Sequence, residues 1–166
     1  MDIRELVMAS EENALDRVKV PSREEIQRLQ NEMVKMPQVE VKTEHYFNGG
    51  MYCRKVTRPA GTLIVGKIHK CDHFFMCTSG EIIAWSEKGM VTLKAGDILE
   101  SKAGTKRVTL AVVDSIGITV HKTSLTDLDE IEAELIEPEE GSRYDSGNNI
   151  IPLKAEDQPS ITAREV

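Results

Sequence analysis

Two short patterns of glycines and polar residues constrain this chain more than any other feature. The first pattern contains Gly61, Lys67, His69, His73 and Gly80, and the second contains Gly96, Lys102, Gly104 and Arg107. Residues two positions apart on a strand project from the same face, so Lys67 and His69 are expected to share a side. The spacing therefore predicts that these two side chains act from one face of the same strand.

The segment that contains both patterns is rich in strand signals. From Val39 to Lys122 the spacing of apolar residues changes from about 3.6 to about 2. Turn sequences such as Asn48-Gly49-Gly50 divide this segment into short runs. The expected strands are 39–47, 51–58, 62–69, 73–78, 81–86, 90–95, 97–101, 106–113 and 116–122. Many short strands in succession predict an all-β sandwich or small barrel rather than alternating strands and helices.

A helix is expected on each side of the strands. The first begins with a capping box at Ser22 and Glu25 and ends at Pro37. Its apolar stripe consists of Ile26, Leu29, Met33 and Met36. For the second helix, Thr126 is the expected cap, Glu137 the last residue and Pro138 the stop, and Leu128, Ile131 and Leu135 form one face.

These elements divide the chain into three parts. Residues 1–21 form an N-terminal arm with room for a short helix after Ser10. Residues 22–138 form one domain that includes both flanking helices. Residues 139–166 are polar and contain Gly147, Pro152 and Pro159, so we expect a tail without a core of its own.

The net charge of −7 is distributed unevenly. The segment 125–140 carries eight acids and no base, whereas 41–123 carries twelve basic and seven acidic residues. This separation favours a small anionic ligand or self-association over broad nucleic-acid binding. An uneven surface without a function explains the charges equally well.

Composition and cysteine content indicate a cytoplasmic protein without membrane contact. No apolar run approaches the roughly 20 residues that span a bilayer, and the first residues lack a signal-peptide pattern. Cys53, Cys71 and Cys77 are odd in number and form no C-x-x-C pair. We expect them to be buried free thiols.

Three histidines are candidate metal ligands. On one straight strand, His69 and His73 would lie roughly 13 Å apart, too far to share an ion. We therefore expect a bend at 70–72 that brings the rings together, with Asp72 either steadying the bend or orienting a histidine. His121, late in the strand region, would supply a third nitrogen. This set suits a divalent transition metal such as Zn, Fe, Ni or Mn.

An anion pocket is the competing interpretation of the same residues. Lys67 and Arg107 place two cations beside the histidines, and arginine cannot ligate a metal. Together with His69 and His73 they could bind a phosphate, carboxylate or nucleotide. A third alternative is that all these side chains are partly solvated and bind nothing.

The two patterns resemble the two motifs of the cupin family, glycine for glycine. Cupins have H-x-H and then Glu in the first motif, where this chain has Lys67-x-His69 and then His73. The histidine of the second cupin motif is Arg107 here. The resemblance implies a cupin, or double-stranded β-helix, barrel.

A finer resemblance covers roughly residues 21–136. Gly66-Lys67-Ile68-His69-Lys70, Gly104-Thr105-Lys106-Arg107 and Val120-His121 are similar to small cupin-like proteins encoded by tailed bacteriophages. This implies a phage or bacterial origin and a location in the host cytoplasm or the virion.

Two functions follow as expectations. The first is a non-enzymatic phage protein, either a virion or assembly component or a small-ligand-binding module with a modified cupin pocket. It would associate with itself as a homo-oligomer, and with other virion proteins or a small anionic ligand. The alternative is a metal-dependent cupin enzyme that uses His69, His73 and His121.

Overall fold

The computed structural model describes residues 20–153. Most of the expected N-terminal arm, including the short helix after Ser10, therefore lies outside the described residues. The end of the expected tail, from residue 154, lies outside them as well.

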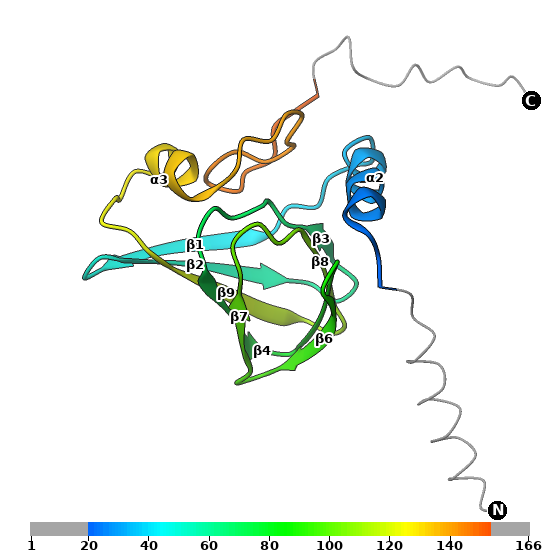
Figure 1. Ribbon diagram of the computed structural model, residues 1–166, viewed down its shortest axis with the longest axis horizontal. Helices are drawn as coiled ribbons and strands as arrows, with labels where there is room; N and C mark the ends of the chain where they lie inside the picture. The colour runs from blue at the N-terminus through cyan, green and yellow to red at the C-terminus, as the bar shows by residue number, and fades with distance from the viewer. Residues whose placement is uncertain (1–19, 154–166) are drawn as a thin grey trace, which may run out of the picture.

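The described chain is mostly β-strand, with one helix before the strands and one after them (Figure 1). The strands are β1 (Lys42–Asn48), β2 (Met51–Arg58), β3 (Leu63–Val65), β4 (His73–Ser79), β5 (Glu81–Ser86), β6 (Gly89–Lys94), β7 (Ile98–Ser101), β8 (Arg107–Ala111) and β9 (Ser115–Lys122). They form two antiparallel sheets with the orders β1-β2-β9-β4-β7 and β3-β8-β5-β6. The predicted all-β class with a flanking helix on each side is confirmed.

The strand register decides which side chains meet between the two sheets. Val56 of β2 pairs with Gly117 of β9, and Gly117 pairs with Cys77 of β4. Phe75 and Cys77 pack against Ile82 of β5 and Leu93 of β6 in the second sheet. These contacts form the apolar core. Alternate residues on the same strands extend this interior face toward the histidines.

The first helix, α2 (Arg23–Met33), begins at the predicted capping box. The Ser22 hydroxyl accepts from the Glu25 amide at 3.2 Å, and the Glu25 carboxylate accepts from the Ser22 amide at 2.8 Å. Ile26 is 1% exposed and anchors the helix. Met36, which was expected to continue the apolar stripe, lies beyond the end of the helix and is 57% exposed.

The second helix, α3 (Leu128–Leu135), is shorter than predicted. Its cap is Asp127 rather than Thr126, because the Asp127 carboxylate accepts from the amides of Asp129 and Glu130 at 3.0 Å. The helix ends at Leu135 because Ile136 is extended and pairs with His69. The apolar face is as expected, since buried Ile131 and Leu135 pack against Tyr52.

The described part of the expected polar tail returns over the strands. Figure 1 shows it passing from α3 toward α2. The Arg143 guanidinium donates to the Val34 carbonyl at 2.7 Å, and the Tyr144 hydroxyl donates to the Val39 carbonyl at 2.8 Å. Residues 139–153 thus cover the segment that joins α2 to β1.

The three cysteines are free thiols, as predicted. Cys77 is buried and Cys53 half-buried, whereas Cys71 is exposed, so the expectation of burial was wrong for Cys71. Cys71 lies at the bend between β3 and β4, where the chain passes over the surface. Within residues 20–153, no helix has the length and apolar character needed to cross a membrane.

Gly117 is expected to be essential for close packing between the sheets. A Cβ there would lie 3.0 Å from Phe75 Cε2 and 3.4 Å from Arg58 Nη2. Gly117→Ala should therefore lower the free energy of unfolding by about 1–3 kcal/mol, measured by urea denaturation. Gly66→Ala is the matched control, because its nearest contact, at 3.7 Å, is an ordinary one. Equal midpoints for the two variants would contradict this account of the core.

Candidate metal and anion site

Three histidine rings meet at one end of the interior. The centroid of the His69 ring lies 4.0 Å from that of His73 and 4.9 Å from that of His121, and the third pair is 4.6 Å apart. One ligand nitrogen from each ring falls within 4.8 Å of the other two. The structure therefore brings together the three residues that the sequence suggested as metal ligands.

Each ring comes from a different part of the fold. His121 lies on β9 opposite Tyr52 of β2 and is 4% exposed. His73 is the first residue of β4 and pairs with Ser101 of β7. His69 lies in the loop after β3, outside the regular sheet.

Backbone contacts to α3 hold His69 in place. The Lys70 amide donates to the Leu135 carbonyl at 2.8 Å, and the Glu137 amide donates to the Ile68 carbonyl at 2.9 Å. On its other side, the His69 carbonyl accepts from the Gly104 amide at 2.8 Å. The loop is thus tied both to the end of α3 and to the second glycine pattern.

The predicted bend at 70–72 is present, and Asp72 steadies it. One Asp72 oxygen accepts from the Ala103 amide at 2.8 Å, and the other lies 2.9 Å from Lys102 Nζ. These two contacts hold the pKa of the Asp72 carboxyl below its usual value. The bend stacks the His69 and His73 rings, which a straight strand would keep apart.

The environment keeps the imidazoles neutral. Burial, followed by the neighbouring His73 and His121, lowers the pKa of His69 to about 2. Burial and the neighbouring His73 lower the pKa of His121 to about 3, and burial is the main cause that lowers the pKa of His73. Neutral imidazole is the form that binds a metal ion.

The cluster also has an unmet bonding requirement. The Nδ1 atom of His69 is buried and has no hydrogen-bond partner. His73 Nδ1 lies 3.3 Å from the Cys71 carbonyl. Among the described residues the cluster consists of histidines alone, a donor set that suits Zn, Fe, Ni or Cu.

Two arginines lie beside the rings. Arg107 of β8 donates to the Ser101 hydroxyl at 2.7 Å, and its charge lowers the pKa values of His69 and His73. Arg54 of β2 lowers the pKa values of all three histidines. The site therefore combines neutral nitrogen ligands with nearby positive charge.

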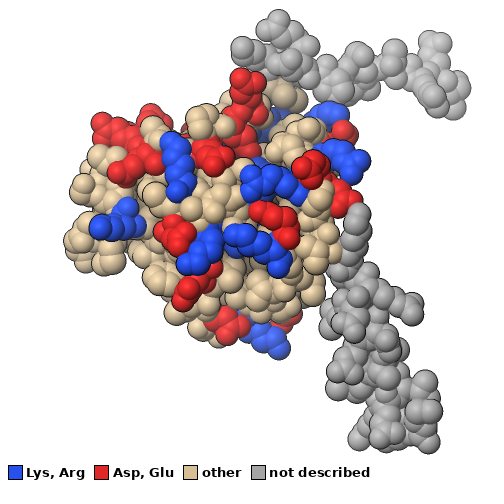
Figure 2. Space-filling model, in the orientation of Figure 1, with Lys and Arg blue, Asp and Glu red and all other residues tan. Residues whose placement is uncertain are grey.

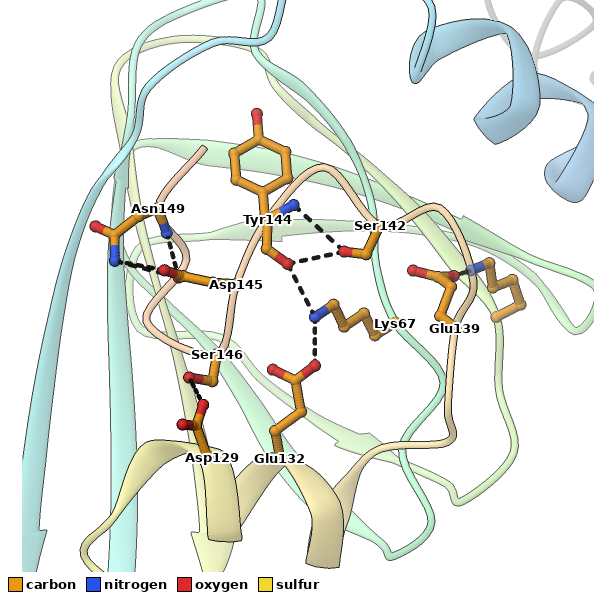
Figure 3. A network of polar contacts seen from close by, with 10 residues as sticks. Lys67, Asp129, Glu132, Glu139, Ser142, Tyr144, Asp145, Ser146 and Asn149 are labelled. Carbon is orange, nitrogen blue, oxygen red and sulfur yellow. Dashed lines mark hydrogen bonds and ion pairs between the residues drawn. The ribbon is translucent and has the colours of Figure 1, made fainter. Parts of the chain in front are cut away.

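Lys67 has a different neighbour from the one expected. Its Nζ lies 2.6 Å from Glu132 Oε1 on α3 and 3.4 Å from the Tyr144 carbonyl (Figure 3). This ion pair satisfies the ammonium group, so the structure does not bring it into the histidine cluster. Its role as an anion ligand stays a prediction.

Acidic residues after the strands pair with lysines of the same chain. Lys106 is 1% exposed, and its Nζ lies 2.7 Å from Glu139 Oε1. Lys67 pairs with Glu132 in the same way, at 2.6 Å. Lys106, which precedes β8, and Arg107, its first residue, have separate partners, Glu139 and Ser101. In Figure 2, acidic side chains gather over α3 at the upper left, while acidic and basic ones are mixed over the strands.

Two interior arginines were missed in the sequence. Tyr52, Arg54, Val56 and Arg58 alternate along β2, and Tyr52, Val56 and Arg58 are buried. The same two-residue period that identified β2 would have placed Arg54 and Arg58 on its inner face. His45, by contrast, is a structural residue whose Nδ1 lies 2.8 Å from the Tyr52 hydroxyl.

Comparison with known proteins finds similarity in fold only. No family model matches the chain, and no curated protein matches its sequence. A cupin superfamily protein from Desulfitobacterium hafniense has 10% identity and a TM-score of 0.47, covering 54% of this chain and 83% of its own. KdgF from Halomonas sp. has 17% identity and a TM-score of 0.47, covering 55% and 87%.

A third similar structure is a Cupin 2 conserved barrel domain protein from Salinispora arenicola. It has 12% identity and a TM-score of 0.43, covering 51% of this chain and 76% of its own. Two of the three carry the cupin name, the family that the sequence patterns resemble, and none bears on a bacteriophage origin. At these identities, the chemistry of the site has to be derived from this chain's own residues.

The metal-free protein is expected to lose stability in mild acid because of this cluster. Native His69 and His121 have pKa values of about 2 and about 3. In the unfolded chain both residues take up protons near pH 6.5. The unfolded state then binds more protons, so the free energy of unfolding falls as pH decreases below about 6.5, by about 1.4 kcal/mol per pH unit for each histidine.

Urea denaturation in a chelator at several pH values measures this dependence. The free energy of unfolding of His121→Gln should depend on pH less steeply than that of the unsubstituted protein. The difference in slope should correspond to about one proton, since the two proteins share all their carboxylates. Identical slopes would contradict a neutral, buried His121.

Proposed function

We propose that the protein binds one divalent transition-metal ion through His69, His73 and His121. The observation that carries the proposal is the convergence of three ring nitrogens within 4.8 Å in the interior. Residues from β9, β4 and the loop after β3 come together only in the folded chain. The site would therefore be formed by folding.

The residues fit such an ion in two respects. Their lowered pKa values keep the rings neutral near pH 7, which removes proton competition for the nitrogen lone pairs. If Nδ1 of His69 is the ligand, a bound ion would satisfy this buried atom, which has no hydrogen-bond partner. If Nε2 is the ligand, the ion would fix which nitrogen of the ring carries the proton. A bound ion would supply Lewis-acid chemistry, polarising an oxygen of a ligand beside it.

We further propose that a small anionic compound binds next to the metal. Arg107 opposes a lone dication, and an anion between it and the ion would offset that repulsion. Buried Thr119 Oγ1 supports the same proposal, because it has no hydrogen-bond partner and Thr119 lies two residues from His121 on β9. Whether the bound compound is transformed or only held decides between an enzyme and a ligand-binding module.

Elemental analysis of protein purified without chelators or an affinity tag tests the metal. We expect about one transition-metal ion per chain, and its loss in His69→Ala and His121→Ala, since each removes one of three ligands. His45→Gln is the matched control, because His45 contacts Tyr52 and Gly147 outside the cluster. Absence of metal, together with no uptake of added Zn²⁺, Ni²⁺, Fe²⁺ or Mn²⁺, would contradict the proposal.

A non-enzymatic phage role, as a virion or assembly component, and a location in the host cytoplasm or virion remain proposals from the sequence resemblance. Homo-oligomerisation also stays a proposal. It is supported by exposed apolar side chains where β1 meets β2, since Tyr46 is 50% and Met51 is 51% exposed.

Sedimentation at high protein concentration and moderate salt tests self-association. We expect a dimer or trimer that Tyr46→Ser combined with Met51→Ser weakens, because the pair removes apolar area from the hairpin tip. A monomer of the unsubstituted chain under these conditions would end the idea.

A further inference from the structure

A cavity opens on the side of the strands that faces α2. It has a volume of about 200 Å³ and lies between β2, β3, the end of α2 and the segment 139–148. Two arginines of β2 contribute to its wall, Arg54 and Arg58. The three histidines are not part of its lining, so the cavity is separate from the proposed metal site.

Arg58 is a buried cation without a carboxylate partner among residues 20–153. It is 7% exposed, its Nη1 donates to the Thr109 hydroxyl at 2.7 Å, and its guanidinium carbon lies 5.5 Å from the centre of the Phe75 ring. Its Nε is buried with no hydrogen-bond partner. A buried charge that lacks a counterion is strongly unfavourable, so this side chain is expected to have an anionic partner.

Arg54 lies on the same face of β2 and is half-buried. No hydrogen bond or ion pair joins it to another residue in the described part of the chain. Of the other cations of the wall, Lys67 pairs with Glu132, whereas Arg143 has no acidic partner among the described residues but donates from Nη1 and Nε to the carbonyls of Val34 and Ile151. Two guanidinium groups therefore remain available in the cavity.

The two acids of the wall, Glu139 and Asp145, make no hydrogen bond or ion pair with these arginines, and the four cations of the wall outnumber them. Glu139 lies 2.7 Å from Lys106, and the Asp145 carboxylate accepts from the amide and side chain of Asn149 (Figure 3). These contacts hold the pKa of Asp145 below its usual value. The charge balance of the cavity consequently favours an anion from outside the described residues.

The rest of the wall is largely apolar. Met33 of α2, Val41, Val56 of β2 and Ile64 of β3 all line it. An inorganic anion would leave this surface without contacts, whereas an organic acid would cover it with its hydrocarbon part.

We propose that this cavity binds a small organic carboxylate, with the carboxylate held by Arg58 and Arg54 and the apolar body against Val56 and Ile64. Arginine suits this role because its planar group binds both oxygens of a carboxylate at once. Binding here does not depend on the histidines and goes beyond the proposed metal site.

Isothermal titration of the full chain at low salt tests the site with butyrate, hexanoate and octanoate. Hexanol and inorganic phosphate are the comparison probes. Hexanol has the hydrocarbon part without the charge, and phosphate has the charge without the hydrocarbon part. We expect one of the carboxylates to bind more tightly than both. If phosphate binds as tightly as the carboxylates, the apolar wall does not contribute to recognition. If hexanol binds as tightly, the arginines do not contribute. Absence of binding by all three carboxylates would overturn the proposal.

Substitutions locate the binding. Arg58→Met should weaken carboxylate binding about 10- to 100-fold, as expected for loss of charge-assisted hydrogen bonds. The ligand-free variant should be at least as stable, because an unpaired buried charge is replaced by an apolar side chain of similar length. Arg54→Gln, at a half-buried position, should also weaken carboxylate binding. It replaces Arg58→Met as the test variant if Arg58→Met does not fold.

Two controls separate this site from other effects. Arg28→Gln removes one positive charge from the exposed face of α2 and should leave the affinity unchanged. His121→Ala should also leave it unchanged, even if it abolishes metal binding. Loss of carboxylate affinity in His121→Ala would place the anion at the histidines instead, and unchanged affinity in both Arg58→Met and Arg54→Gln would overturn the assignment.

Discussion

The antiparallel register of β2, β9 and β4 is the constraint on which the interior depends. It places Tyr52 opposite His121 and Val56 opposite Gly117, so that one face of three strands carries both the apolar core and the polar site. A shift of one residue in β2 would turn Arg54 and Arg58 to the outer face and Cys53, Lys55 and Thr57 inward. Core packing against Phe75 opposes that shift, and it thereby keeps the polar residues in place.

Charge in this molecule is balanced locally rather than across the whole chain. The acids that follow β9 face lysines of the strand region, as Glu132 faces Lys67 and Glu139 faces Lys106. These pairs hold α3 and the segment after it against the strands. The interior arginines receive no such partner among the described residues, so positive charge without an acidic partner lies near the histidine cluster and in the cavity that faces α2.

Much of the fold could be predicted because strand and helix signals are local. Short-range patterns identify the nine strands, the capping box at Ser22 and the bend that Asp72 steadies. The third strand is Leu63–Val65 rather than the expected 62–69, so Lys67 and His69 lie beyond its end. The cap of α3 was misplaced by one residue, since Thr126 and Asp127 are both suitable caps and only the structure selects one.

The members of the histidine cluster were predictable because a bend was required at 70–72, although His69 lies in the loop after β3 and not on the expected strand 62–69. The partner of Lys67 was not, since it depends on where α3 packs against the strands, which no local pattern encodes. Arg54 and Arg58 were overlooked for a different reason. Charged residues on a strand are usually solvent-facing, and here tertiary packing encloses them.

Two backbone hydrogen bonds tie the loop of His69 to the end of α3. The Lys70 and Glu137 amides cross-link the loop and the helix end in both directions. Any ligand that holds His69 therefore also favours the packed position of α3, by an amount that grows as RT ln(1 + [L]/Kd). Reciprocally, a partner that pulled α3 away would weaken the binding of that ligand by the same free energy. The position of the helix is therefore thermodynamically linked to the occupancy of a site that its own side chains do not form.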